Sequence, residues 1–336
     1  MGHINIPVFI PHMGCPNQCI FCNQRHISGT VEFSEDDVEK QILKIIEAVD
    51  EKDIEIAFFG GSFTGIDRNL MIRLLDLAQK YVNLGKAKSI RMSTRPDYIS
   101  EEILDILDRY SISCVELGIQ SMNDDVLRFL KRGHSTNDTI NAIKLLNKRN
   151  IPFVGQMMIG LPKATIQDEI YCAEFICKNG AVGSRIYPTL VFNQTELADL
   201  TKSGEYTPLS LDEAVYRSSE VLNVFVENNV PCIRIGLCES ENLHSDKTFV
   251  AGPNHPSIGE MVKSQLYRKL IIERFSKVTP SKDIIIECPC GAVSQIVGNK
   301  KKNLIEFRNT YGIKRVKIRE NPSLKPYDIK IITKED

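Results

Sequence analysis

The sequence predicts an α/β fold: a partial (β/α)6 barrel of the TIM type followed by a small C-terminal α/β appendage. Two observations support this prediction. Over the first 235 residues or so, short apolar runs alternate with amphipathic stretches, as in parallel strands joined by right-handed helical crossovers. This rhythm changes near residue 243. We therefore expect a barrel over residues 1–243 and an appendage over residues 244–336.

The expected barrel strands are short apolar runs that end in glycine or in polar residues. The run IEIAFF, for example, is followed by Gly60 and Gly61, which is typical of a buried strand that ends in a tight turn. The expected strands cover residues 4–9, 54–59, 88–93, 113–119, 153–159, 182–187 and 231–235.

The expected helices show apolar residues three or four positions apart, with start and stop signals at their ends. Ser100 precedes two acidic residues, which is good chemistry for a helix start, and Asn179 with Gly180 is a common stop. The barrel helices cover residues 35–49, 68–82, 100–110, 124–130, 136–147, 166–178 and 210–228. The appendage has helices at 256–276 and 299–311 and strands at 284–287, 316–319 and 329–332.

Composition and charge narrow the class of protein. The chain has 336 residues, of which 42% are hydrophobic and 25% charged, as in ordinary globular enzymes. No apolar run approaches the roughly 18 residues of a membrane span, and the N-terminus lacks the features of a signal peptide. We expect a cytoplasmic location and no membrane partner. Residues 291–336 carry 11 Lys and Arg against 5 Asp and Glu, so this end either contacts RNA or is a solvated face.

Ten cysteines occur, and disulfides are not expected in a reducing cytosol. Cys114, Cys172 and Cys177 sit in apolar patterns and are expected to be small buried side chains. Cys288 and Cys290, in the segment CPCG, form a second metal site, a redox pair or a turn.

Three cysteines near the N-terminus differ from the rest. Cys15, Cys19 and Cys22 follow the first strand within one short loop, CPNQCIFC, so their thiolates can converge on one centre. A closed structural zinc site needs a fourth ligand, which only a distant histidine such as His12 or His26 could supply. Cubane clusters commonly use four cysteines, so three leave one iron open to another ligand. A chance grouping is the remaining alternative.

Polar residues at the strand ends suggest a ligand site. The Gly60–Gly61 pair allows a positive φ and close backbone approach to a ligand, although any tight turn could use it. The segment STRPD at 93–97 is either part of this site or a helix-entry turn. A polar side chain within a buried strand costs roughly 1–3 kcal/mol unless it is paired. For Gln120 and Gln156 we favour ligand contact, and for Glu116 a structural role is equally plausible.

The cysteine spacing, with aromatic Phe21 before the third cysteine, resembles the hallmark CxxxCx(aromatic)C of the radical S-adenosylmethionine (SAM) superfamily. The segments STRPD, VELGIQS, KRGHS and GQMMIGLP are similar to one branch of it. That branch contains the radical-SAM subunit of Elongator, which modifies wobble uridines in tRNA, and more distantly coproporphyrinogen dehydrogenase. The resemblance covers about residues 11–188 and extends more loosely to 236.

The resemblance implies a [4Fe–4S] cluster on Cys15, Cys19 and Cys22, with the open iron chelated by SAM. An electron from flavodoxin or ferredoxin would cleave SAM, and the resulting 5′-deoxyadenosyl radical would take a hydrogen atom from the substrate. Ser62 stands where the family often has Glu in the motif that binds the SAM ammonium. Tyr187 would lie at the edge of SAM. The SAM-binding residues implied are Phe21, Gly60, Gly61, Ser62, Ser93, Arg95, Gln120, Gln156 and Arg185.

The substrate is the least constrained part of the prediction. We expect no acetyltransferase domain in this chain, which favours a small-molecule substrate. The specific prediction is queuine, as for the family's queuine lyases that release a 7-deazaguanine precursor. Glu116, Asp97 and Glu239 are candidate carboxylates for a deazaguanine. The alternatives are Elongator-like modification of tRNA, drawing on the basic appendage, and a non-catalytic cluster-binding protein. Cys238 is a candidate hydrogen-atom donor, and His255 is structural or binds substrate.

Overall fold

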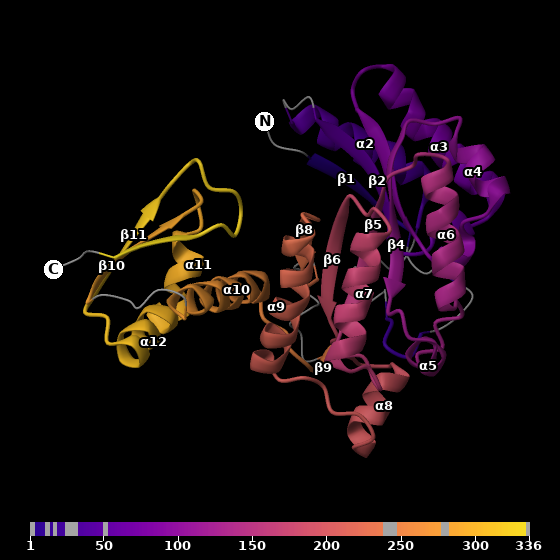
Figure 1. The fold of residues 1–336 in the computed structure, drawn as a ribbon. Helices are drawn as coiled ribbons and strands as arrows, with labels where there is room; N and C mark the ends of the chain where they lie inside the picture. Colours follow the sequence, from indigo (N-terminus) through magenta and orange to yellow (C-terminus); the bar gives the residue numbers. More distant parts are fainter. Residues whose placement is uncertain are drawn as a thin grey trace.

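The computed structural model describes residues 4–10, 14–15, 19–23, 33–49, 53–237, 247–276 and 282–333. Figure 1 shows a large curled α/β body and, beside it, a smaller α/β unit at the C-terminal end of the chain. The fold class predicted from the sequence is therefore confirmed.

The body is built on one sheet of seven parallel strands in the order β1-β2-β3-β4-β5-β6-β8. The strands are β1 (Ile4–Phe9), β2 (Ile54–Phe59), β3 (Ser89–Thr94), β4 (Ile112–Gln120), β5 (Phe153–Ile159), β6 (Gly183–Pro188) and β8 (Cys232–Ile235). Among the described residues β1 and β8 are the edges and do not pair with each other, so the sheet curls into a half-barrel. Six strand–helix units followed by β8 match the predicted partial barrel.

Helices cover the outer face of this sheet (Figure 1). They are α2 (Glu35–Ala48), α3 (Arg68–Asn83), α4 (Glu101–Leu107), α5 (Asp124–Phe129), α6 (Thr136–Lys148), α7 (Ile166–Lys178) and α9 (Leu211–Glu227). Apolar side chains from strands and helices fill the space between the two layers, with Phe58, Phe153 and Phe225 fully buried. These apolar contacts lie between the helices and the outer face of the sheet. The polar side chains of the strands therefore project from the concave inner face.

Side-chain caps fix where several of these helices begin. Ser100 accepts a hydrogen bond from the backbone N–H of Ile103, as its position in the sequence predicted. Capping boxes, in which two residues satisfy each other's backbone N–H groups, begin α6, α7 and α9. These caps place the helix starts at the carboxyl ends of the strands.

Segments after β6 and after β8 form short elements that the sequence pattern does not predict. A short pair of antiparallel strands, β7 (Val191–Phe192) and β9 (Phe249–Ala251), lies near helix α8 (Glu196–Ser203). The strands have two and three residues, which is too short for an alternating pattern to appear in the sequence.

The C-terminal appendage is a three-stranded sheet in the order β11-β10-β12, packed on helices. Its elements are β10 (Asp283–Cys288), α11 (Val293–Val297), α12 (Lys302–Tyr311), β11 (Arg315–Glu320) and β12 (Lys330–Thr333). β11 is parallel to β10 and β12 antiparallel to it. The appendage has a hydrophobic core of its own around Ile286 and Phe307.

Helix α10 (Ile258–Phe275) joins the two parts. Its first half packs into the barrel core through Ile258, Val262 and Leu266, and its second half packs into the appendage core through Ile271 and Phe275. The predicted boundary at residue 243 stays a prediction, since this helix belongs to both cores. No helix among the described residues is long and apolar enough to cross a membrane.

Candidate active site

A cavity of about 290 Å³ opens where the parallel strands end. All nine residues predicted to bind SAM line this cavity, together with two of the three loop cysteines. The lining includes Cys15, Phe21, Cys22, Gly60, Gly61, Ser62, Ser93, Arg95, Gln120, Gln156 and Arg185. Glu116 and Tyr187 line it as well. The structure thus brings residues from six strands and the cysteine loop to one place, while their roles toward SAM stay a prediction.

The cysteine loop is anchored to the barrel on two sides. The backbone N–H of Ile20 donates to the carbonyl of Leu130, and the N–H of Leu197 donates to the carbonyl of Ile20. The Ile20 side chain is buried against α5 and α8. The N–H of Cys22 donates to the carbonyl of Cys19 at 2.9 Å, which folds the loop into a turn and brings these two cysteines together.

Glycines let the cysteine loop pack directly on the turn after β2. Gly14 has φ +74°, and a Cβ there would lie 2.3 Å from the carbonyl oxygen of Ser62. Cys15 Sγ consequently lies 3.5 Å from the Ser62 hydroxyl oxygen. Gly60 has φ +103°, a conformation that only glycine adopts easily, so the expected close approach at the end of β2 is present.

The donor set fits an iron–sulfur cluster with positive charge beside it. Among the described residues, no three His, Cys, Asp or Glu side chains form a site for a single metal ion, and His12 and His26 lie outside that part of the chain. Three thiolates on a cluster would leave net negative charge in a buried place. Arg132 Nη1 lies 3.5 Å from Cys19 Sγ and is well placed to offset that charge.

Arg95 is a second cation near the cysteines and, unlike the half-buried Arg132, it is fully buried. It is only 1% exposed and donates two hydrogen bonds to Asp97, at 2.9 and 2.8 Å. Burial alone would lower the pKa of Arg95, but Asp97 and the thiolate charges of Cys19 and Cys15 raise it. Its Nη1 has no hydrogen-bond partner among the described residues, so a buried donor is available to a ligand. Asp97 is occupied by this contact and does not line the cavity, which removes support for its proposed contact with a deazaguanine.

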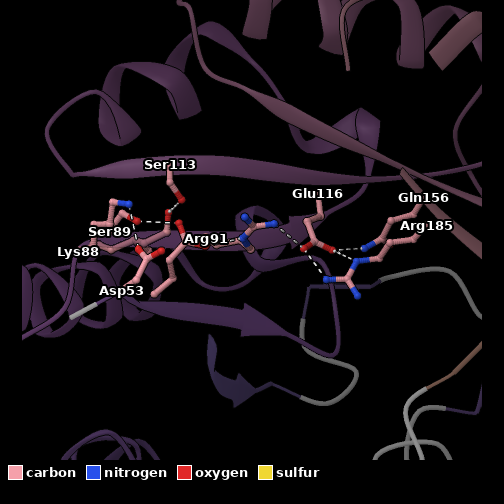
Figure 2. A network of polar contacts seen from close by, with 10 residues as sticks. Asp53, Lys88, Ser89, Arg91, Ser113, Glu116, Gln156 and Arg185 are labelled. Carbon is pink, nitrogen blue, oxygen red and sulfur yellow. Dashed lines mark hydrogen bonds and ion pairs between the residues drawn. The ribbon is translucent and has the colours of Figure 1, made fainter. Parts of the chain in front are cut away.

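Glu116 is the centre of a polar network on the concave face of the sheet (Figure 2). Its carboxylate is fully buried and accepts hydrogen bonds from Arg91 at 3.2 Å, Gln156 at 2.7 Å and Arg185 at 2.8 Å. The strand register explains why these side chains lie together. Gln156 on β5 is the register partner of Arg185 on β6, and register partners on neighbouring strands project from the same face.

The network continues away from the cavity toward the amino ends of the strands. Arg91 also pairs with Glu55 at 2.9 Å, and Glu55 accepts a further bond from Ser89 at 2.7 Å. Burial would lower the pKa of Arg185, but Tyr187 and Glu116 raise it. Glu116 therefore has a structural role, since its carboxylate accepts hydrogen bonds from three side chains. It also forms part of the cavity wall, so contact with a ligand stays a prediction.

Gln120 shows the strain that is common in ligand sites. It ends β4 with φ +66°, a left-handed conformation that is unusual for a residue other than glycine. Its side-chain oxygen is buried without a hydrogen-bond partner among the described residues. An unsatisfied acceptor on a cavity wall supports ligand contact at this residue.

Sequence reasoning missed Arg132 and His134. Both lie in the KRGHS segment, and nothing in its composition distinguishes a cation that contacts the cysteine loop from a fully exposed one. His134 is 5% exposed, and its ring nitrogens make no hydrogen bond of normal geometry with any described residue. Burial, with the positive charge of Arg132, lowers the pKa of His134 to about 3. This histidine therefore stays neutral in the folded protein.

The other cysteines and His255 have ordinary environments. Cys288 is buried in the appendage core, Cys290 is exposed, and the N–H of Ala292 donates to Pro289, so CPCG forms a turn. Burial raises the pKa of Cys114 to about 12, as expected for a small side chain of the interior. His255 Nδ1 accepts from the N–H of Ser257 next to the start of α10. Cys238 and Glu239 lie outside the described residues.

Comparisons with known proteins agree with this geometry. Residues 9–176 match the model of the radical SAM superfamily, and residues 182–268 match that of the Radical SAM C-terminal domain. An uncharacterised protein of Methanocaldococcus jannaschii is 31% identical over 243 residues, which cover 68% of this chain and 73% of that protein. A tRNA uridine(34) acetyltransferase of Methanocaldococcus infernus is 34% identical over 146 residues, covering 42% of this chain.

This chain spans only 27% of the length of that acetyltransferase. Among solved structures, the Elp3 protein of Methanocaldococcus infernus superimposes with a TM-score of 0.62 at 23% identity, over 80% of this chain and 64% of that one, a likeness that concerns the fold. Members of the matched family use a [4Fe–4S] cluster and SAM, and these are the cofactors of this protein. The chain belongs to the radical SAM superfamily.

Proposed function

We propose that this chain binds its cluster through Cys15, Cys19 and Cys22 and cleaves SAM reductively to start a hydrogen-atom abstraction. One observation carries this proposal: the cysteine loop and the polar strand ends line a single cavity. When bound, the cluster and SAM supply a 5′-deoxyadenosyl radical. Flavodoxin or ferredoxin is the proposed source of the electron, in a cytoplasmic setting.

The chain's own residues would bind and orient SAM and the substrate and would shield them from water. Phe21, Gly60, Gly61 and Ser62 form the wall next to the cysteines and would hold the amino-acid part of SAM. Ser93, Arg95, Gln120, Gln156 and Arg185 lie around the rest of the cavity and would border SAM and substrate. Within the described part of the chain, Arg95 has a buried donor and Gln120 a buried acceptor without a partner, so a polar ligand would satisfy both groups. The half-barrel around them keeps water away from a radical.

For the substrate we propose a base in tRNA. One relative, the tRNA uridine(34) acetyltransferase of Methanocaldococcus infernus, acts on tRNA by its name and points to tRNA for this branch of the family. The basic C-terminal region supports an RNA partner for this chain. The activities of the longer relatives do not by themselves extend to this chain, because this chain spans only part of their length.

Queuine, released as a 7-deazaguanine precursor by a lyase reaction, is the second candidate substrate. The observation in its favour is that Glu116 and Gln156 lie together on the cavity wall, where a carboxylate and an amide suit the edges of a deazaguanine. Glu116 already accepts bonds from three side chains, which weakens this argument, and none of the relatives we report is a queuine enzyme.

One experiment separates these candidates. The anaerobically reconstituted protein is incubated with SAM and dithionite, with either bulk tRNA or queuine, and 5′-deoxyadenosine is measured. Stimulation by tRNA together with a modified nucleoside in the digested RNA supports the tRNA proposal. Stimulation by queuine alone, with a new deazaguanine product, replaces it with the lyase. If the intact cluster yields no 5′-deoxyadenosine with either substrate or without one, the proposed reductive cleavage is wrong.

A further inference from the structure

A second and larger hollow, of about 680 Å³, lies between the barrel and the appendage. We call it the lysine groove. Its walls come from the first turns of α9 and α10, from α11, and from the segment between α11 and α12. Helix α9 connects two parallel strands and therefore runs back from their carboxyl ends to their amino ends. Its first turn, and so the lysine groove, lies at the same end of the barrel as the candidate active site.

A small hollow lies between the lysine groove and the active-site cavity. This hollow, of about 30 Å³, shares Leu237 with the active-site cavity and His255 with the lysine groove. The three hollows therefore share lining residues at the carboxyl end of the barrel. The lysine groove and the cluster cavity thus lie on neighbouring parts of the protein.

Lys300 and Lys302 line the groove, and the backbone at Lys300 and at Lys301 between them is strained. Lys300 has φ +49° and Lys301 has φ +62°, and each left-handed residue of this kind costs roughly 1–3 kcal/mol. Just before them, a Cβ on Gly298 would lie 2.9 Å from the side chain of Asn303. Strain of this kind persists only where the surroundings enforce it.

Asn303, inside the appendage, holds the strained backbone of the lysine segment in place. The residue is 4% exposed, and its amide nitrogen lies 3.0 Å from the hydroxyl of Ser264 on α10 and within 3.4 Å of the carbonyls of Ser264, Gln295 and Ile296. The amide thus ties the lysine segment to both α10 and α11. The lysine segment is presented on a fixed support rather than on a loose surface loop.

The charge of the groove favours an anionic ligand. Lys300, Lys301 and Lys302 are exposed and form no ion pair with any residue that the structure describes. Of the two acidic residues in the lining, Glu260 is neutralised by Lys263 at 2.8 Å, which leaves Asp212. The ring of Tyr216, on the opposite wall, is 51% exposed, which is high for an aromatic side chain.

We propose that the lysine groove binds a strand of the RNA substrate. Lys300 and Lys302 would contact backbone phosphates, and Tyr216 would stack on a base, the combination used in sequence-tolerant binding of single strands. The nucleotide to be modified, elsewhere on the same RNA, would enter the cluster cavity at the same end of the barrel. The inference rests on the proposed RNA substrate and adds to it a binding surface outside the radical site.

The test measures RNA affinity of the cluster-loaded protein by fluorescence anisotropy, with bulk tRNA and with a single-stranded RNA oligonucleotide, at several salt concentrations. Lys300→Gln combined with Lys302→Gln should weaken binding about tenfold and lower the slope of log affinity against log salt by about 1.5, as for two lost phosphate contacts. Tyr216→Leu should weaken binding about fivefold with an unchanged salt slope.

The matched control is Lys317→Gln combined with Lys330→Gln, two exposed lysines on β11 and β12 of the same appendage that do not line the groove. This pair removes the same charge and should change affinity less than twofold. The proposal that RNA binds in the lysine groove would be wrong if both pairs of substitutions weakened RNA affinity equally. It would also be wrong if the groove pair kept its RNA affinity while its iron content and melting temperature were preserved. RNA that binds there without stimulating 5′-deoxyadenosine formation would instead contradict the proposed tRNA substrate and leave the groove in place.

Discussion

The guanidinium of Arg132 lies directly on the backbone of Gly118. Its Nη2 donates a hydrogen bond to the Gly118 carbonyl at 3.1 Å, and a Cβ at position 118 would come within 2.7 Å of that nitrogen. The other terminal nitrogen of Arg132 reaches Cys19 Sγ. The absence of a side chain at Gly118 is therefore what allows a cation to approach the cysteine loop at this point.

Gly118→Ala should act on the cluster through Arg132. Displacing the guanidinium removes positive charge near the cluster, which makes reduction harder and lowers the reduction potential by about 60 mV, the equivalent of 1.4 kcal/mol for one electron. Arg132→Gln should give the same shift, and the double variant should add little to either. A redox titration followed by electron paramagnetic resonance checks this. If Gly118→Ala lowered the potential but Arg132→Gln did not, the proposed route through Arg132 would be wrong.

Replacing cysteines should distinguish cluster ligands from the remaining thiols. Cys19→Ala is expected to abolish the absorbance and the iron of the reconstituted cluster, because two thiolates do not hold a cubane. Cys290→Ser is the matched control, since Cys290 is exposed in the CPCG turn and contacts no cysteine of the loop. It should retain about four irons per chain. A loss of iron in Cys290→Ser would instead reveal a second cluster.

Glu116→Gln should destabilise the fold strongly. The substitution leaves Arg91 and Arg185 facing a neutral group inside the barrel, and breaking a buried ion pair costs about 3–5 kcal/mol. Chemical denaturation measures the loss. Glu101→Gln removes an exposed carboxylate that also contacts two cations, and it should leave the denaturation midpoint where it was. Similar midpoints for both variants would show that solvent screens the network around Glu116.

The buried His134 should make the fold sensitive to acid. Its pKa is lowered to about 3 in the folded state, below the ordinary value of about 6.5 for an unfolded chain. The stability it contributes is thus complete above about pH 6.5 and is lost as the pH falls toward 3. At pH 5 the loss amounts to about 2 kcal/mol. His134→Leu should flatten the pH profile of unfolding over this window, and an unchanged profile would contradict the assignment.

Most of the fold and much of the site could be predicted because their signals are local. Strand and helix periods are read over a few residues, and the spacing of Cys15, Cys19 and Cys22 falls within one loop. The polar strand ends could be placed together because parallel strands end at the same edge of a sheet. Gln120 and Gln156 were found in this way, as polar residues in apolar strands.

The parts that could not be predicted depend on long-range contacts. Arg132 lies in a polar segment after α5, and it is half-buried where it contacts Gly118 and Cys19. His134 looks the same in the sequence as an exposed histidine. The sequence makes Asp97 a reasonable ligand candidate, but its carboxylate accepts a hydrogen bond from Arg95, two residues earlier. Each of these outcomes is set by the approach of separate chain segments, which local pattern does not encode.

Helix α10 has a consequence for how the protein unfolds. Its first half lies in the barrel core and its second half in the appendage core, so neither core can lose its packing without disturbing a helix that the other needs. The two parts should therefore melt in one cooperative calorimetric transition. For the same reason, hinge motion between them would bend a continuous helix, and a strand of RNA would meet a groove whose width is already set.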